Sequence, residues 1–216
     1  MKKAMCIIEV IFDTAYLLAA FIIGIILLSK AKDSSVYLLA GLMALILMIG
    51  DSFHLVPRII NAFKSNSANM VKYLGLGKQI ASLTMAGFYI LLWTVGINIF
   101  GVANHLPYTI IIYILFAIRI VLCLLPQNKW YTSDQPINWA IYRNIPFFLQ
   151  GMIVAILYFL NRNINANLAF IYIAIILSFA FYLPVVLLAN RHKMIGILML
   201  PKTLSYVYML VMFLLI

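Results

Sequence analysis

The strongest constraint on the fold is a series of seven long apolar runs separated by short polar connections. A helix of about 20 apolar residues spans the hydrocarbon core of a bilayer. The runs predict helices at about 5–29, 35–60, 72–99, 106–126, 137–161, 166–190 and 194–216. The chain is 66% hydrophobic and 9% charged, whereas a soluble domain is about half apolar and a quarter charged. We therefore expect an all-α, polytopic membrane protein with one seven-helix transmembrane domain over residues 1–216.

Basic residues are distributed unevenly between the two ends of this expected bundle. Lys30, Lys32 and Arg162 fall at one end. The other end, which carries the N-terminus, holds Lys2, Lys3, Arg58, Lys64, Lys72, Lys78, Arg119, Lys129, Arg143, Arg191, Lys193 and Lys202. Cytoplasmic loops of membrane proteins are enriched in Lys and Arg. This pattern predicts a cytoplasmic N-terminus and an external C-terminus in the cell membrane, with membrane lipids as neighbours, and it explains the net charge of +10 without a nucleic-acid partner.

A carboxylate, an imidazole and a guanidinium interrupt the second apolar run. Asp51, His54 and Arg58 are spaced i, i+3 and i+7, so on a helix they share one face. A charge at bilayer depth costs roughly 3 kcal/mol or more, and it persists where it faces a partner, a cavity or a function. We expect this face to be functional.

Other runs also carry polar residues within the membrane. Glu9, Asp13 and Tyr16 share one face of the first run, and Arg119 and Lys202 interrupt the fourth and seventh runs. Tyr206 follows Lys202 by one turn. Near the cytoplasmic ends of the runs are Arg58, Lys78, Gln79, Tyr142, Arg143 and Asn144. Since the opposite halves of the runs are almost purely apolar, the sequence predicts a polar cavity that opens to the cytoplasm and is closed on the outside.

The balance of charges suggests a ligand. Cations outnumber acids in this group, which favours a small anionic or zwitterionic ligand with a phosphate or carboxylate. Asp51 could act as a general base or orient a water, and His54 could share the proton. Alternatively, a transporter or receptor would bind the same ligand without chemistry. A third possibility is purely structural, with the acids pairing with Arg119 and Lys202 to hold the bundle together.

We expect neither a metal nor another cofactor. Of the three histidines, only His54 falls inside an apolar run; His105 and His192 fall in connections at opposite ends. A catalytic zinc usually takes three protein ligands. The pattern therefore favours chemistry by side chains alone.

Two segments of the chain read GLMALILMIGDSFHLVPR and LGLGKQIASLTMAGFYILLW. They resemble segments of the YhhN family of lysoplasmalogenase-like membrane proteins. Gly50 and Asp51 match the Gly-Asp pair of that family, and Pro57 and Arg58 match the following turn. FAFYLPVVLLANRHK and LPKTLSYVYMLVMFLLI are similar to its last two helices. The resemblance implies an intramembrane hydrolase that acts on ether lysolipids, with Asp51 as the acid.

The chain departs from that family at three points. The family typically has eight helices, and its second helix has no counterpart here. Its second acidic position corresponds to Pro184, and the histidine expected in the helix after the Gly-Asp pair is not found. If both acids are needed for vinyl-ether hydrolysis, the chain would keep the fold of that family without its activity.

Overall fold

The computed structural model describes residues 2–63, 68–188 and 193–216. Within these residues it is helical and holds no strand, and seven helices are long and apolar enough to cross a membrane. The prediction of an all-α chain with seven helices of spanning length is therefore confirmed. The helices are α1 (Lys2–Ser29), α2 (Ser35–Phe63), α3 (Ala68–Phe100), α4 (Leu106–Leu124), α5 (Ile137–Leu160), α6 (Ile171–Leu188) and α7 (Met199–Leu214).

The helix bounds differ from the expected ranges mainly in the last two spans. α6 is preceded by a 3₁₀ turn at Ala166–Leu168, and α7 by another at Lys193–Leu198. Pro201 lies in the first turn of α7, where its missing N–H leaves no intrahelical hydrogen bond unmade. The predicted end of the sixth span at residue 190, and the basic residues Lys64 and Arg191, lie outside the described residues.

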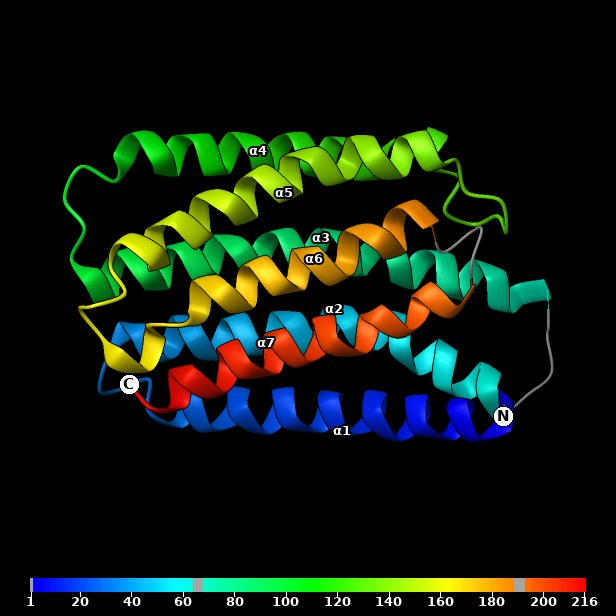
Figure 1. The fold of residues 1–216 in the computed structure, drawn as a ribbon, viewed down its shortest axis with the longest axis horizontal. Helices are drawn as coiled ribbons and strands as arrows, with labels where there is room; N and C mark the ends of the chain where they lie inside the picture. The colour runs from blue at the N-terminus through cyan, green and yellow to red at the C-terminus, as the bar shows by residue number, and fades with distance from the viewer. Residues whose placement is uncertain (1, 64–67, 189–192) are drawn as a thin grey trace.

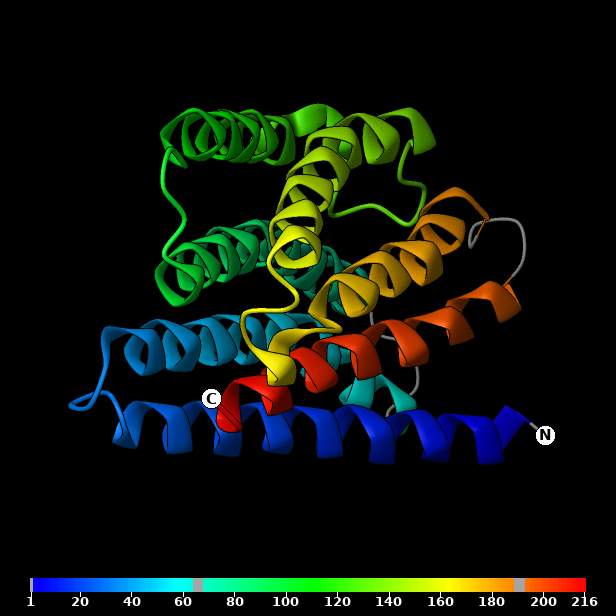
Figure 2. The same cartoon turned by 60° about the vertical axis from the view of Figure 1, so that its left-hand side comes forward.

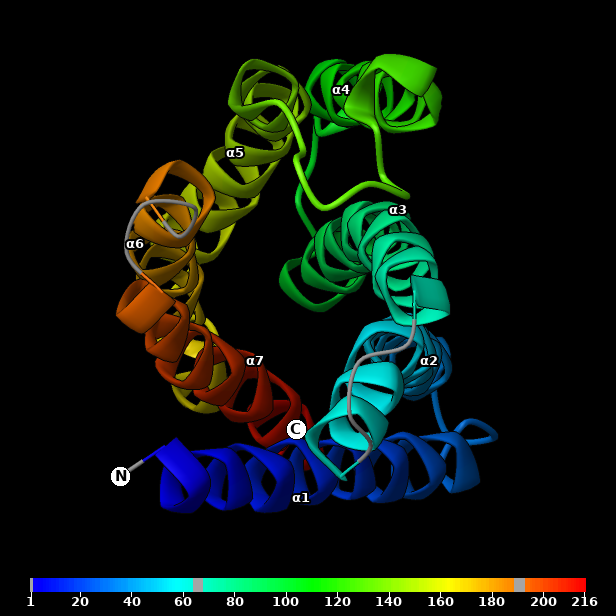
Figure 3. The ribbon, with the colours of Figure 1, turned by 90° about the vertical axis from the view of Figure 1, so that its right-hand side faces the viewer.

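The helices form a closed arrangement in which each packs on its neighbours in the chain. α1 packs on α2 and α2 on α3, the series continues through α4, α5 and α6, and α7 returns to α1. Figure 3 shows this ring viewed along the bundle. Figure 2 shows α1 running along one side, against α2 and the end of α7. The two termini lie at opposite ends (Figure 1), as an odd number of crossings requires.

α2 and α3 approach each other closely at glycines. A Cβ on Gly50 would lie 1.8 Å from the Thr84 hydroxyl oxygen, and a Cβ on Gly77 would lie 2.1 Å from the Phe53 carbonyl oxygen. Pro57, inside α2, cannot donate the usual hydrogen bond to that carbonyl. Small residues at such contacts allow membrane helices to pack backbone against backbone. The tight α2–α3 contact fixes the segment that carries Asp51 and His54.

An aromatic cluster fills the interior between the two ends of the bundle. Tyr89 contacts the rings of Phe88, Phe147 and Phe179, and Phe88 also contacts Tyr206. All five side chains are buried. Edge-to-face ring contacts of this kind pack the core densely. The interior is therefore densely packed where the middles of α3, α5, α6 and α7 meet.

Candidate functional site

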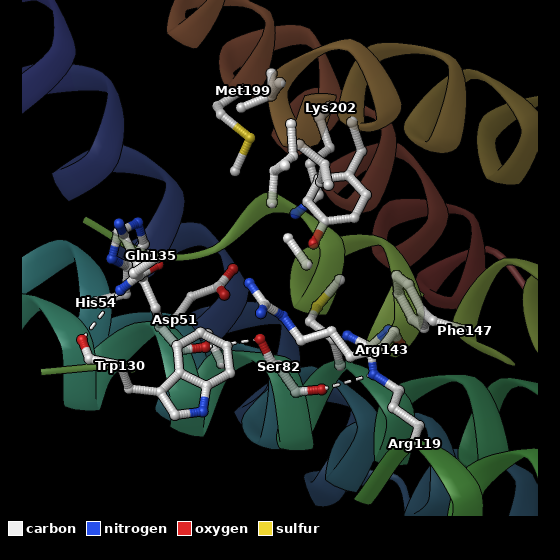
Figure 4. Close-up of a pocket in the computed structure, with 18 residues that line it drawn as sticks. Asp51, His54, Ser82, Arg119, Trp130, Gln135, Arg143, Phe147, Met199 and Lys202 are labelled. Atoms are coloured by element: carbon white, nitrogen blue, oxygen red, sulfur yellow. Dashed lines mark hydrogen bonds between the residues drawn. The ribbon is translucent and has the colours of Figure 1, made fainter. Parts of the chain in front are cut away.

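A cavity of about 270 Å³ lies beside the aromatic cluster, toward the end of the bundle that carries the N-terminus. Phe147 belongs to both. Six helices, α2 to α7, contribute polar groups to the cavity, and Figure 4 shows its lining. Six of the residues singled out from the sequence line it: Asp51, His54, Lys78, Arg119, Arg143 and Lys202. The structure thus brings together residues of five different helices, from α2 to α7.

Arg119 of α4 is held by neutral oxygen atoms. It is 1% exposed. Its Nε donates to the Ser82 carbonyl at 3.0 Å, and its Nη1 to the Arg143 carbonyl at 3.3 Å and to Asn144 Oδ1 at 3.4 Å. The guanidinium carbon lies 3.7 Å from the centre of the Phe147 ring. These contacts satisfy several donors and orient the fork, but they leave its charge without a counter-ion.

Arg143 of α5 is held by the connection between α4 and α5. Its Nη1 donates to Asn128 Oδ1 at 2.8 Å, and its guanidinium carbon lies 4.2 Å from the centre of the Trp130 ring. Figure 3 shows this connection entering the ring of helices instead of extending away from it. Asn128 and Trp130 are both buried. A carbonyl oxygen and an aromatic face again hold a cation without neutralising it.

The two lysines of the cavity have even fewer partners. Lys202 Nζ lies 4.8 Å from the centre of the Tyr182 ring and 5.4 Å from that of Tyr206. All five acidic residues of the chain fall within the described ranges. No carboxylate there lies within 4.0 Å of a Lys78, Arg119, Arg143 or Lys202 nitrogen, since the ion pairs found involve Arg58. The cavity therefore gathers four cations without a direct counter-ion from the protein.

The acid and the imidazole of the cavity come from consecutive turns of α2. Asp51 Oδ2 accepts a hydrogen bond from the Tyr16 hydroxyl at 2.7 Å, which links α2 to α1. Asp51 and Lys202 both line the cavity (Figure 4). His54 Nδ1 is buried and has no hydrogen-bond partner among the residues that the structure describes. Buried polar atoms are nearly always paired, so this nitrogen marks a place for a ligand or a water.

Arg58 belongs to a separate ion-pair group. Its Nη2 lies 2.7 Å from Glu9 Oε2, and its Nη1 lies 3.9 Å from Asp13 Oδ2. None of these three residues lines the cavity. The end of α2, beyond Pro57, turns toward α1 (Figure 1), and it carries Arg58 to the two carboxylates. The face shared by Asp51, His54 and Arg58 thus divides between a cavity and a structural contact.

Four further sequence candidates surround the cavity or lie away from it. Asn144 accepts from Arg119 and from the Tyr182 hydroxyl. Gln79 donates to the Cys123 carbonyl and accepts from Tyr131. Tyr206 belongs to the aromatic cluster beneath Lys202. Tyr142 is exposed and contacts Trp139, because the inward direction of Arg143 turns its neighbour about 100° away around the helix.

Other cavity residues did not stand out in the sequence. Ser82, Trp130, Gln135, Phe147 and Tyr182 line it. Only the tryptophan could have been suspected, because it stands in an otherwise polar connection, and nothing in the order of residues shows that this connection folds inward. Among the described residues, no group of three His, Cys, Asp or Glu side chains could hold a metal ion.

Comparison of this chain with family models, with curated proteins and with solved structures finds no match. The class of the molecule therefore follows from its fold and its cavity. Within the described residues it is a helical bundle with seven helices long and apolar enough to cross a membrane, and it has a cationic cavity near one end.

Proposed function

We propose that this chain is a multi-pass protein of the cell membrane that binds an amphiphile with an anionic or zwitterionic head group and hydrolyses it. One observation carries the proposal. Lys78, Arg119, Arg143 and Lys202 line one cavity, and the described residues offer none of them a direct carboxylate partner.

An anionic head group would supply the missing charge. A cation at membrane depth costs about 2.5–3.5 kcal/mol on the scale of helix insertion. A phosphate or carboxylate would regain that cost through charge-assisted hydrogen bonds, which are roughly twice as strong as neutral ones. The ammonium groups of Lys78 and Lys202 make no hydrogen bond within the described part of the chain, so their donors remain for a ligand.

The acid and imidazole on α2 suggest the chemistry. The YhhN-like segments point to an ether lysolipid with a vinyl-ether bond. In its hydrolysis an acid protonates the vinyl carbon, water adds to the resulting cation and loses a proton, and the hemiacetal splits into an aldehyde and the glycerol phosphate that carries the head group. Asp51 would donate the proton, and His54 would assist by accepting one from the water. Both side chains line the same cavity as the cations.

The charge distribution supports an orientation for this site. The cavity lies toward the end that carries the N-terminus and most of the Lys and Arg residues. We place that end in the cytoplasm, following the enrichment of basic residues in cytoplasmic loops. The C-terminus is then external, and the ligand reaches the cavity from the cytoplasmic leaflet or the cytoplasm.

Turnover of lysolipids by the purified protein tests the proposal. We expect release of aldehyde from a vinyl-ether lysolipid, and we expect Asp51→Asn to lower the rate by about 10²-fold or more. Asp33→Asn, in an exposed connection at the other end of the bundle, is the matched control and should keep full activity. No turnover by the wild type, or equal turnover by Asp51→Asn, would rule out the hydrolase.

A receptor that binds the same head group without chemistry is the second candidate. The hydrogen bond from Tyr16 to Asp51 favours a receptor, because this bond already engages one of the two carboxylate oxygens of Asp51. The aromatic cluster beyond the cavity makes a transporter less suitable, because the densely packed rings obstruct a path through the bundle. Binding of the lysolipid with no product would favour this receptor.

A further inference from the structure

The charge balance of the cavity narrows the head group that it can hold. Lys78, Arg119, Arg143 and Lys202 contribute four positive charges to its lining. Asp51 contributes one negative charge when it is ionised and none when it holds the proton for catalysis, so three or four positive charges remain. A zwitterionic head group adds no net charge. We propose that the ligand carries a phosphate monoester or a diphosphate, with about two negative charges at neutral pH. This inference rests on the proposed function and specifies the ligand class of the same site.

The two arginines are arranged to receive such a group. Arg119 donates to the backbone carbonyl of Arg143 at 3.3 Å, so the first guanidinium lies against the backbone of the second residue. Each guanidinium also rests on an aromatic ring, Phe147 or Trp130. An arginine fork that is already oriented loses little conformational freedom when it binds two oxygens of a phosphate. Two such forks at one cavity suit a group with three terminal oxygens.

Asn128 and Trp130 act as positioning residues for Arg143. Asn128 is fully buried at 0% exposed, and its amide nitrogen donates to the carbonyls of Leu122 and Leu125 at 2.6 and 2.9 Å. The amide is therefore fixed, with its oxygen presented to Arg143 at 2.8 Å. An aspartate in its place would neutralise Arg143 and would lose the two hydrogen bonds that the amide nitrogen donates. The neutral amide leaves the charge of Arg143 available for a ligand.

The phosphate could belong to a lipid or to a water-soluble metabolite. Ile137, Val185, Val186 and Met199 also line the cavity, and they offer an apolar surface beside the cations. A hydrocarbon chain attached to the phosphate would contact this surface. A free phosphate or diphosphate would use the cations alone, so the two sources differ in how much the chain adds to affinity.

The direct test is a titration of the full-length protein in nanodiscs of neutral lipid. The probes are lysophosphatidic acid, lysophosphatidylcholine with the same acyl chain, and inorganic phosphate and pyrophosphate. We expect lysophosphatidic acid to bind at least about tenfold more tightly than the zwitterion, a difference of 1.4 kcal/mol. Equal or tighter binding of the zwitterion would overturn this inference and leave the proposed function standing. If no probe binds, the proposed function itself is wrong.

Variants of Asn128 test the positioning role. We expect Asn128→Asp to reduce the preference for the monoester over the zwitterion about tenfold, with Asn163→Asp, in an exposed connection at the other end, as the control that leaves it unchanged. If Asn128→Asp does not fold, Arg143→Lys keeps the charge, removes the fork and should also reduce the preference. An unchanged preference in the variant that folds would overturn the role. Equal weakening of the binding of lysophosphatidic acid and lysophosphatidylcholine would also overturn the role, because the loss of a merely structural residue would produce it.

Discussion

At the scale of single residues, the cations of the candidate membrane spans occupy two kinds of environment. Arg58 lies between the carboxylates of Glu9 and Asp13, so its charge is compensated by the protein. Lys202 contacts the faces of Tyr182 and Tyr206, which are weaker partners for a cation than a carboxylate. Removing the charge of Arg58 strands two acids, whereas removing that of Lys202 relieves a charge without a direct counter-ion. The two residues should therefore respond oppositely to neutral substitution.

Spacing in the sequence identified the charged residues of the cavity, but it did not separate them from the charged residues that lie outside the cavity. Asp51, His54 and Arg58 share a helix face, and only the first two line the cavity. A helical pattern gives a direction around the axis, and it does not show which neighbouring helix lies there. The carboxylates of α1 decide the position of Arg58, and their approach depends on tertiary packing.

At the scale of helices, the α2–α3 contact is the element that positions Asp51 and His54. Gly77→Ala would place a Cβ 2.1 Å from the Phe53 carbonyl oxygen. Because that atom belongs to the backbone, the helices must separate, and we expect a loss of about 1–3 kcal/mol of stability. Thermal unfolding in detergent measures this loss, and ligand affinity should fall with it because the cavity wall shifts.

Gly87→Ala is the matched control on the same helix. A Cβ at Gly87 meets nothing within 4 Å, and alanine is the better helix former by about 0.5–1 kcal/mol. This variant should be at least as stable as the wild type. If both alanine variants behave alike, the close approach of α2 and α3 does not matter for the site.

The inward course of the α4–α5 connection could not be predicted from the sequence. The seven helices follow from apolar runs, because each run must satisfy its own backbone in a bilayer. The connection at 125–136 carries no such signal and reads as a polar loop. Its inward course depends on Asn128 and Trp130 meeting Arg143, which lies in the next helix, and on Gly75, which leaves room for the Trp130 carbonyl.

At the scale of the whole molecule, the uneven distribution of Lys and Arg predicts the orientation in the membrane. Single cysteines at Lys129 and Asn163, in exposed connections at opposite ends, can report it after Cys6 and Cys123 are replaced by serine. In intact cells, we expect a membrane-impermeant maleimide to label the cysteine at 163 and to spare the one at 129. The reverse pattern would place the N-terminus outside and the cavity at the external surface.

The uneven distribution of Lys and Arg also affects the stability of the bundle. A bundle that concentrates cations around one cavity is less stable without its ligand than packing alone would make it. A ligand that binds only the folded protein stabilises it by mass action. We infer that these cations are kept for an anionic ligand and not for the fold.

The apparent melting temperature of wild type, Lys202→Met and Arg58→Met, with and without lysophosphatidic acid, tests that claim most directly. Without the lipid, we expect Arg58→Met to melt about 2–4 °C below the wild type and Lys202→Met to melt at or above it. With the lipid, wild type and Arg58→Met should rise, and Lys202→Met should rise much less. If Lys202→Met is destabilised like Arg58→Met and keeps the full rise, Lys202 serves the fold and the claim is contradicted.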